Sequence, residues 1–298
     1  MAATWQRLGD AAGTAGVGIS RIRIDPGRLS TPPHSHSASE EIVFVLGGDG
    51  LSWQDGSVYQ VRAGDCIVHV ADREEHTLRA GSAGLDVLVF GTRHATELGW
   101  LPRSNAVRLG WPWVEGRTDD PWDIEAQVEP LEFGDPSDRP STIVGLQDCP
   151  EFPEEIHSKS LGEEAGSVRT GLNWLELKAG EHSSLPHCHS TEEEAFVILD
   201  GEGTLELWPS PLAAERGAVR EDVPVRAGHV VARPPATRIG HRLTAGAGGM
   251  TLLAYGTREP GDIAYHPRSN KLFFRGLGVI GRIEHLAHGE GESEERDA

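Results

Sequence analysis

Residues 186–203 have the sequence PHCHSTEEEAFVILDGEG, and residues 33–50 have the sequence PHSHSASEEIVFVLGGDG. Each stretch places two histidines two residues apart, a glutamate five residues later, and then an apolar segment before Gly-x-Gly. Histidine nitrogens and glutamate oxygens are good ligands for divalent transition metals. One such stretch could arise by chance, whereas two in equivalent settings predict a repeated metal-binding unit. We expect each apolar segment to be a β-strand that ends in a Gly-x-Gly turn.

The two stretches belong to a longer internal repeat. Before the paired histidines Gly18 matches Gly171, and further on Gly91-Thr92-Arg93 matches Gly256-Thr257-Arg258 at a larger spacing. Most of the difference in spacing falls between Trp208 and Val223, which predicts a longer hairpin loop in the second copy. A repeat of this length predicts a duplicated domain.

The repeat divides the chain into four parts. We expect an N-terminal domain over residues 1–118 and a C-terminal domain over residues 157–281. The segment between them, residues 119–156, is rich in Asp, Glu and Pro and is expected to be an extended linker. The acidic tail, residues 282–298, has few apolar residues and is expected to be disordered.

Short apolar and alternating segments recur within each copy, separated by turn residues. In the first copy residues 18–24, 42–46, 66–70 and 85–90 have this character. Many short strands with frequent turns are typical of all-β sandwiches and barrels, and no long helical period interrupts them. The chain is therefore predicted to be all-β.

The paired histidines are suited to bind one ion together. Residues i and i+2 of a β-strand point to the same face, so His34 lies beside His36, and His187 beside His189. A fourth donor is expected from a distant strand that closes the pocket. His76 and His241 stand at equivalent places in the two copies and fit this role.

The repeat also selects one glutamate in each copy. Glu41 and Glu194 stand at the same distance before Gly48 and Gly201. We expect the neighbouring glutamates to point elsewhere and to be solvated: Glu40, Glu192 and Glu193.

These residues resemble the motifs of the cupin superfamily. The first family motif is Gly, five residues, His-x-His, three or four residues, Glu, six residues and Gly, and both copies depart from it by one extra residue before the histidines. The second family motif has Pro and Gly shortly before its histidine. His76 lacks both, whereas His241 follows Pro234-Pro235 and Gly240. The departures concern the loops more than the ligands.

The chain is thus similar to a bicupin, and the resemblance implies two tandem cupin barrels of the jelly-roll, or double-stranded β-helix, type. It implies up to one divalent transition metal ion in each domain. Iron or manganese suits the mixed nitrogen and oxygen donors best, and zinc, nickel and copper also accept them. The expected ligands are His34, His36, Glu41 and His76 in the first domain, and His187, His189, Glu194 and His241 in the second.

Other residues have simpler interpretations. His69, His94 and His182 have no histidine partner in the other copy and are interpreted as incidental. Cys188 lies between two ligands and is expected to point away from the ion into the core. The repeated arginines are expected to brace the polypeptide by pairing with carboxylates or carbonyls, or alternatively to bind an anionic substrate: Arg93, Arg103, Arg258 and Arg268.

Charge and composition exclude several partners. The net charge is −19, with 46 acidic and 27 basic residues, and no basic patch stands out, so no nucleic acid is expected. No apolar stretch is long enough to span a membrane, and the first residues lack an apolar signal core. The three cysteines form no CxxC pair. We expect a cytoplasmic protein, monomer or homodimer, whose partner is a small-molecule substrate.

Three functions are compatible with such sites, and the sequence assigns no catalytic residue beyond the metal ligands. Three imidazoles and one carboxylate leave coordination positions open, as in catalytic metal sites. The resemblance favours an oxidoreductase of dioxygenase type that acts on a small organic substrate inside the barrel. The alternatives are an isomerase or decarboxylase of small acids or sugars, and a non-catalytic protein that binds a sugar or another small ligand.

Overall fold

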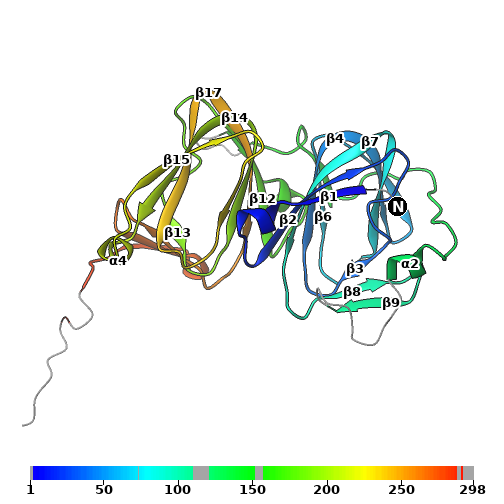
Figure 1. Ribbon diagram of the computed structural model, residues 1–298, viewed down its shortest axis with the longest axis horizontal. Helices are drawn as coiled ribbons and strands as arrows, with labels where there is room; N and C mark the ends of the chain where they lie inside the picture. Colours follow the sequence, from blue (N-terminus) through cyan, green and yellow to red (C-terminus); the bar gives the residue numbers. More distant parts are fainter. Residues whose placement is uncertain (1–2, 73, 110–120, 152–156, 287–289, 291–298) are drawn as a thin grey trace, which may run out of the picture.

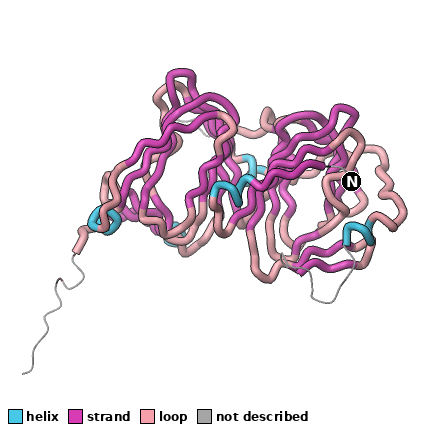
Figure 2. Tube along the Cα trace, in the orientation of Figure 1, coloured by secondary structure: helices cyan, strands magenta, loops and turns pink. Residues whose placement is uncertain are grey.

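The computed structural model describes residues 3–72, 74–109, 121–151, 157–286 and 290. The described chain forms two β-barrels side by side, as Figure 1 shows. The strands dominate both barrels, and the helices are short, with some of them lying between the barrels (Figure 2). The predicted all-β fold of two tandem barrels is confirmed.

The N-terminal barrel is built around two long strands, β4 (Glu41–Gln54) and β7 (His76–Thr92). These strands pair with each other and lie in the middle of a seven-stranded sheet with the order β1-β2-β7-β4-β6-β10, in which β5 also pairs with β4. A second sheet has the order β3-β8-β9. The other strands are β1 (Ala3–Arg7), β2 (Val17–Ile24), β3 (Ser35–His36), β5 (Ser57–Arg62), β6 (Asp65–His69), β8 (Leu98–Leu101), β9 (Ala106–Leu109) and β10 (Ile143–Gly145).

The C-terminal barrel repeats this plan around β14 (Glu194–Pro209) and β17 (Ile239–Thr257). Its main sheet has the order β11-β12-β17-β14-β15, with β16 paired to β14, and its second sheet has the order β13-β18-β19-β20. The other strands are β11 (His157–Lys159), β12 (Thr170–Leu177), β13 (Cys188–His189), β15 (Glu221–Arg226), β16 (Val230–Arg233), β18 (Ile263–His266), β19 (Lys271–Phe274) and β20 (Val279–Arg282). The helices of the two barrels and of the linker are α1 (Leu8–Ala12), α2 (Pro121–Glu125), α3 (Leu161–Glu164), α4 (Pro211–Glu215) and the 3-10 helix η1 (Arg275–Leu277).

The expectation that each strand ends at Gly-x-Gly is wrong. Strand β4 passes through Gly48 and continues to Gln54, and β14 passes through Gly201 in the same way. Both glycines have positive φ, 82° and 77°, and the register with the partner strand shifts around each of them. Such a β-bulge bends a strand, so a single long strand can serve both ends of the barrel.

The loop expected between Trp208 and Val223 is present. Helix α4 and the turn that follows it connect β14 to β15 there. In the first copy β4 and β5 are joined by the short turn after Gln54. Part of the expected linker also has regular structure, because β10 pairs with β6 at the edge of the N-terminal sheet. Most of the expected tail, residues 287–289 and 291–298, lies outside the described residues.

Each barrel has its own apolar core, and a third cluster joins the two. Ile22, Val45 and Val87 belong to the N-terminal core, and Leu177 and Leu252 belong to the C-terminal core. The third cluster contains side chains of both barrels: Val17, Ile19, Ile42, Phe44, Leu88 and Phe90 together with Leu161, Leu172, Val197, Leu253 and Tyr255. Apolar burial thus holds the barrels against each other.

Two glutamates expected to be solvated instead cross the domain interface. Glu40 is 0% exposed and accepts hydrogen bonds from the backbone N–H of Val168 and Thr170 and from the Ser167 hydroxyl. Glu193 is 2% exposed and accepts the backbone N–H groups of residues 15 and 16. The solvation prediction is therefore wrong, because each carboxylate satisfies a loop of the opposite domain.

Glu192 is also buried, within its own domain. Its carboxylate accepts hydrogen bonds from the Glu259 backbone N–H and from the Arg275 guanidinium, at 2.8 and 2.6 Å.

In the described part of the chain no helix is long and apolar enough to cross a membrane.

Candidate metal centres

The four expected N-terminal ligands come together. His34 and His76 are opposite each other in an isolated antiparallel bridge, with the N–H of His76 donating to the carbonyl of His34 at 2.9 Å. His36 lies in β3, and Glu41 is the first residue of β4. One donor atom from each of the four lies within 4.8 Å of the others. Strand pairing, rather than sequence proximity, thus brings His76 to the motif.

The C-terminal ligands converge on one carboxylate oxygen. Oε2 of Glu194 lies 2.8, 3.3 and 3.4 Å from the Nε2 atoms of His241, His189 and His187. His187 and His241 again face each other in an antiparallel bridge. The same backbone pairing therefore places the distant histidine in both barrels.

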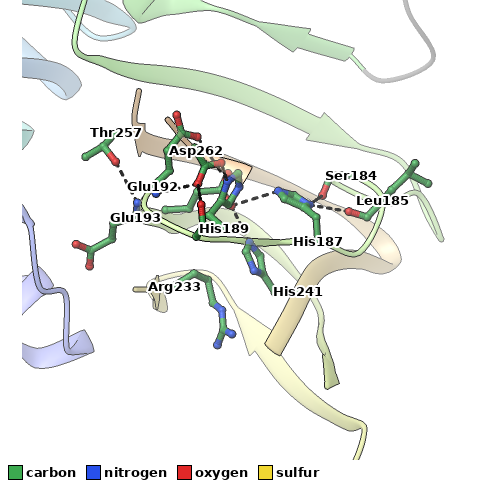
Figure 3. A network of polar contacts seen from close by, with 12 residues as sticks. Ser184, Leu185, His187, His189, Glu192, Glu193, Arg233, His241, Thr257 and Asp262 are labelled. Carbon is green, nitrogen blue, oxygen red and sulfur yellow. Dashed lines mark hydrogen bonds and ion pairs between the residues drawn. The ribbon is translucent and has the colours of Figure 1, made fainter. Parts of the chain in front are cut away.

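The other ring nitrogen of His189 meets a second group of acids. Its Nδ1 lies 2.6 Å from Oδ2 of Asp262 and 3.5 Å from Oε2 of Glu192. Figure 3 shows His189 between this acid group and the rings of His187 and His241. An acid at Nδ1 fixes the orientation and tautomer of a metal-binding imidazole, which leaves Nε2 for the ion.

Glu97 takes the same place in the N-terminal barrel. Its Oε1 lies 3.5 Å from Nδ1 of His36, and its carboxylate accepts the N–H groups of Ser37 and Ser39 at 2.8 and 2.7 Å. In the C-terminal barrel Asp262 accepts the N–H groups of residues 191 and 192. Each acid thus holds both the second histidine and the loop that leads to the ligand glutamate.

The motifs in the sequence do not point to Glu97 and Asp262. They stand at equivalent positions, at the spacing that relates Gly91 to Gly256, so the repeat carried the signal. Their side chains differ in length, and neither lies in a cupin motif. Only the fold shows that the segment after β7, or after β17, returns to the metal cluster.

The electrostatics of the clusters favour a bound cation. Burial would raise the pKa of Glu41, but the close contact with His76 and the charges of the other imidazoles outweigh it and lower this pKa. The pKa of Glu194 is held well below its usual range, because its contacts with His187, His189 and His241 likewise outweigh its burial. Both carboxylates are therefore ionised at neutral pH, the state that metal coordination requires.

The imidazoles within the C-terminal site differ in protonation. Burial lowers the pKa of His241, and of its counterpart His76 in the N-terminal site, to about 4, so both rings are neutral at pH 7. Burial also acts on His189, but the contacts with Glu194 and Asp262 outweigh it and raise its pKa to about 9. The acids of the C-terminal site therefore favour a positive charge beside them. A proton on His189 supplies this charge in place of a metal cation.

The donors present fit a divalent ion. Among the described residues, the Nε2 atoms of His76 and His189 are buried and make no hydrogen bond. A buried polar atom without a hydrogen bond is costly unless something else satisfies it. Metal coordination by Nε2 would satisfy both, so the two His/Glu clusters could each hold a metal ion.

A small cavity of about 50 Å³ adjoins the N-terminal cluster. Its wall includes His34, Glu41 and His76 on the polar side, and apolar side chains such as Val43 and Leu78 on the other. This volume is enough for a few water molecules or a ligand of a few atoms. The ligand set therefore borders a small, partly enclosed space that both polar and apolar side chains line.

His69, interpreted from the sequence as incidental, also lines this cavity, so that interpretation is wrong. Its side chain is 3% exposed, its ring stacks on His76 at a centroid distance of 3.8 Å, and its Nδ1 contacts Glu74. The strand register explains the position, because His69 pairs directly with Glu41. In the C-terminal barrel the partner of Glu194 is Arg233.

The remaining histidines and the cysteine behave as expected. His94 and His182 are exposed and each ring contacts a threonine hydroxyl, and Cys188 is buried.

Three of the four repeated arginines pair as expected. Arg93 contacts Asp10, Arg103 contacts Glu125 and Arg258 contacts Glu163. Arg268 differs, because its guanidinium lies over the ring of Trp208, 5.3 Å from the centroid.

Comparison with known proteins supports this fold. Residues 20–90 match the family model described as Cupin domain. No curated protein matches the chain by sequence. Oxalate decarboxylase from Bacillus subtilis is structurally similar with a TM-score of 0.57 and 13% identity, over 85% of this chain and 71% of that chain.

Two plant proteins are similar to a comparable degree. Procruciferin, an 11S globulin from Brassica napus, has a TM-score of 0.57 and 14% identity, over 85% of this chain and 80% of that chain. The coconut allergen cocosin has a TM-score of 0.61 and 14% identity, over 89% and 83%. At these identities the likeness shows the fold alone. The chain therefore shares the two-barrel fold of these proteins, and its residues 20–90 match the Cupin domain model.

Proposed function

We propose that this protein is a metal-dependent oxidoreductase of dioxygenase type that acts on a small organic substrate inside the barrel. The observation that carries the proposal is the N-terminal cluster of three imidazoles and one carboxylate beside a small cavity. Four protein donors leave open positions on a six-coordinate ion, and open positions distinguish catalytic from structural metal sites.

The residues of the cluster have separate tasks in this proposal. His34, His36, Glu41 and His76 would hold iron or manganese, which would supply redox or Lewis-acid chemistry. Glu97 orients His36, and the apolar wall around Val43 and Leu78 limits access of bulk water. The volume of about 50 Å³ restricts the reacting part of the substrate to a few atoms.

Oxygen consumption tests the proposal directly. The protein is purified without metal, loaded with ferrous iron or manganese, and offered catechols, flavonols, gentisate-like acids and diketones in an oxygen electrode. Uptake that depends on both metal and one substrate class is expected. The double variant His34→Ala/His36→Ala should lose it, whereas His94→Ala, which alters an exposed histidine, should keep it. Absence of uptake across the whole panel contradicts the proposal.

Decarboxylation of small acids is the second candidate. It is favoured by the presence of a His/Glu cluster in each barrel, with four close donors in the first and with His187, Glu194 and His241 in the second, and by the structural likeness to Bacillus subtilis oxalate decarboxylase, a protein with Mn(II) centres. Release of carbon dioxide from a small dicarboxylate without net oxygen consumption would support it over a dioxygenase. A third candidate is non-catalytic binding of a sugar or acid, for which ligand-dependent thermal stabilisation without turnover would be the signature.

A further inference from the structure

The two barrels differ at one position beside the ligand carboxylate. Glu41 pairs across the strands with His69, and Glu194 pairs with Arg233 at the same register position. Directly paired residues of neighbouring antiparallel strands project from the same face of the sheet. Because the side chain of Glu194 points into the barrel towards its histidines, the side chain of Arg233 also projects from the inner face of the sheet.

The guanidinium of Arg233 has few hydrogen-bond acceptors around it among the described residues. One NH2 group donates to the Ile239 carbonyl at 2.9 Å, and its Nε is buried without a hydrogen-bond partner among the described residues. In the described part of the chain, no carboxylate lies within ion-pair distance of this guanidinium. Glu194, the nearest strand partner, is occupied by His187, His189 and His241.

Figure 3 shows the consequence for the site. The side chain of Arg233 lies on the His241 side of the cluster and points away from Asp262 and Glu192. A partly buried guanidinium whose Nε is fully buried is costly unless an anion pairs with it, and its fork of donors matches a carboxylate. The acids that could neutralise it face the other way, towards His189 and Arg275.

We propose that the C-terminal site takes a small carboxylate anion, bound by Arg233, and that the N-terminal site, with His69 at the same position, does not share this preference. The proposal rests on the ion sites of the proposed function, but not on turnover. It deepens that function by giving the C-terminal barrel a substrate or effector class, a small organic acid.

Proton relaxation of water tests this on the full chain. The protein is first titrated with Mn(II), and the loaded protein is then titrated with formate or with formamide, a neutral molecule of similar size. Formate should lower the proton relaxivity of water until the effect reaches a plateau, whereas formamide should leave the relaxivity unchanged. The same formate effect should persist in His34→Ala/His36→Ala, which leaves only the C-terminal site.

Variants at Arg233 complete the test. Arg233→His, which copies the N-terminal barrel, should raise the Kd for formate about tenfold or more, whereas Arg233→Lys, which keeps the charge, should raise it only about threefold. Equal binding of formate and formamide by the wild type overturns the proposal, as does unchanged formate affinity in Arg233→His. Loss of the formate effect in His34→Ala/His36→Ala also overturns it. The first titration reports separately on the ion sites, since failure to bind Mn(II) contradicts the proposed function itself.

Discussion

Oδ2 of Asp262 lies 2.6 Å from Nδ1 of His189, while Nε2 of the same ring faces Glu194. The two ring nitrogens therefore have separate partners, one that orients and one at the ligand cluster. Glu97 stands in the same relationship to His36 in the other barrel. An acid outside the cupin motifs thus positions one histidine in each site.

Removing this acid should weaken metal binding without removing a ligand. Asp262→Ala is expected to lower the metal affinity of the C-terminal site by about 10–100-fold, because His189 loses its fixed orientation. Competition with a chromophoric chelator measures this for each site. The N-terminal site should keep its affinity in this variant, and a matched Glu97→Ala variant should give the reverse pattern. If both sites weaken equally in either variant, the acids stabilise the fold rather than position a ligand.

Removing two ligands should remove one ion. His187→Ala/His189→Ala is expected to bind one metal equivalent fewer than the wild type while the barrel remains folded, because the C-terminal core does not depend on these side chains. Elemental analysis of the metal-loaded protein gives the count, and circular dichroism checks the fold. His182→Ala is the matched control, since this histidine is exposed and lies outside the cluster. An unchanged metal count in the double variant would contradict the ligand assignment.

The sequence predicted which side chains gather in the clusters, because spacing relates the paired histidines to the glutamate and the repeat pointed to the distant His76 and His241. It could not predict the roles of His69 and Arg233, which depend on the register between strands that another strand separates in the sequence. It also misjudged Glu40 and Glu193. A run of adjacent glutamates is usually solvated, and only the packing of one barrel against the other buries this pair.

Breaking the interface carboxylate should destabilise the protein. Glu40→Ala leaves the buried N–H of Thr170 and the partly buried N–H of Val168 without their acceptor, which is expected to cost about 2–5 kcal/mol of unfolding free energy. Urea denaturation followed by tryptophan fluorescence measures the loss. Glu132→Ala removes an exposed glutamate and should stay within about 0.5 kcal/mol of the wild type. A loss as small as that of Glu132→Ala would mean that water replaces the carboxylate at the interface.

The bulge in β4 provides a test of what bends the long strands. Gly48 has a φ of 82°, and a Cβ there would collide with the carbonyl oxygen of Gly84 in the facing strand. Gly48→Ala is therefore expected to destabilise the protein by about 2–4 kcal/mol, from the left-handed backbone and the overpacking together. Gly47→Ala is the matched control, because the neighbouring glycine lacks positive φ and has open space around its Cβ position. Equal thermal stability of the two variants would show that the strand can bend without a glycine at position 48. A selective loss in Gly48→Ala would show that this glycine is required where β4 turns from the metal cluster towards the far end of the barrel.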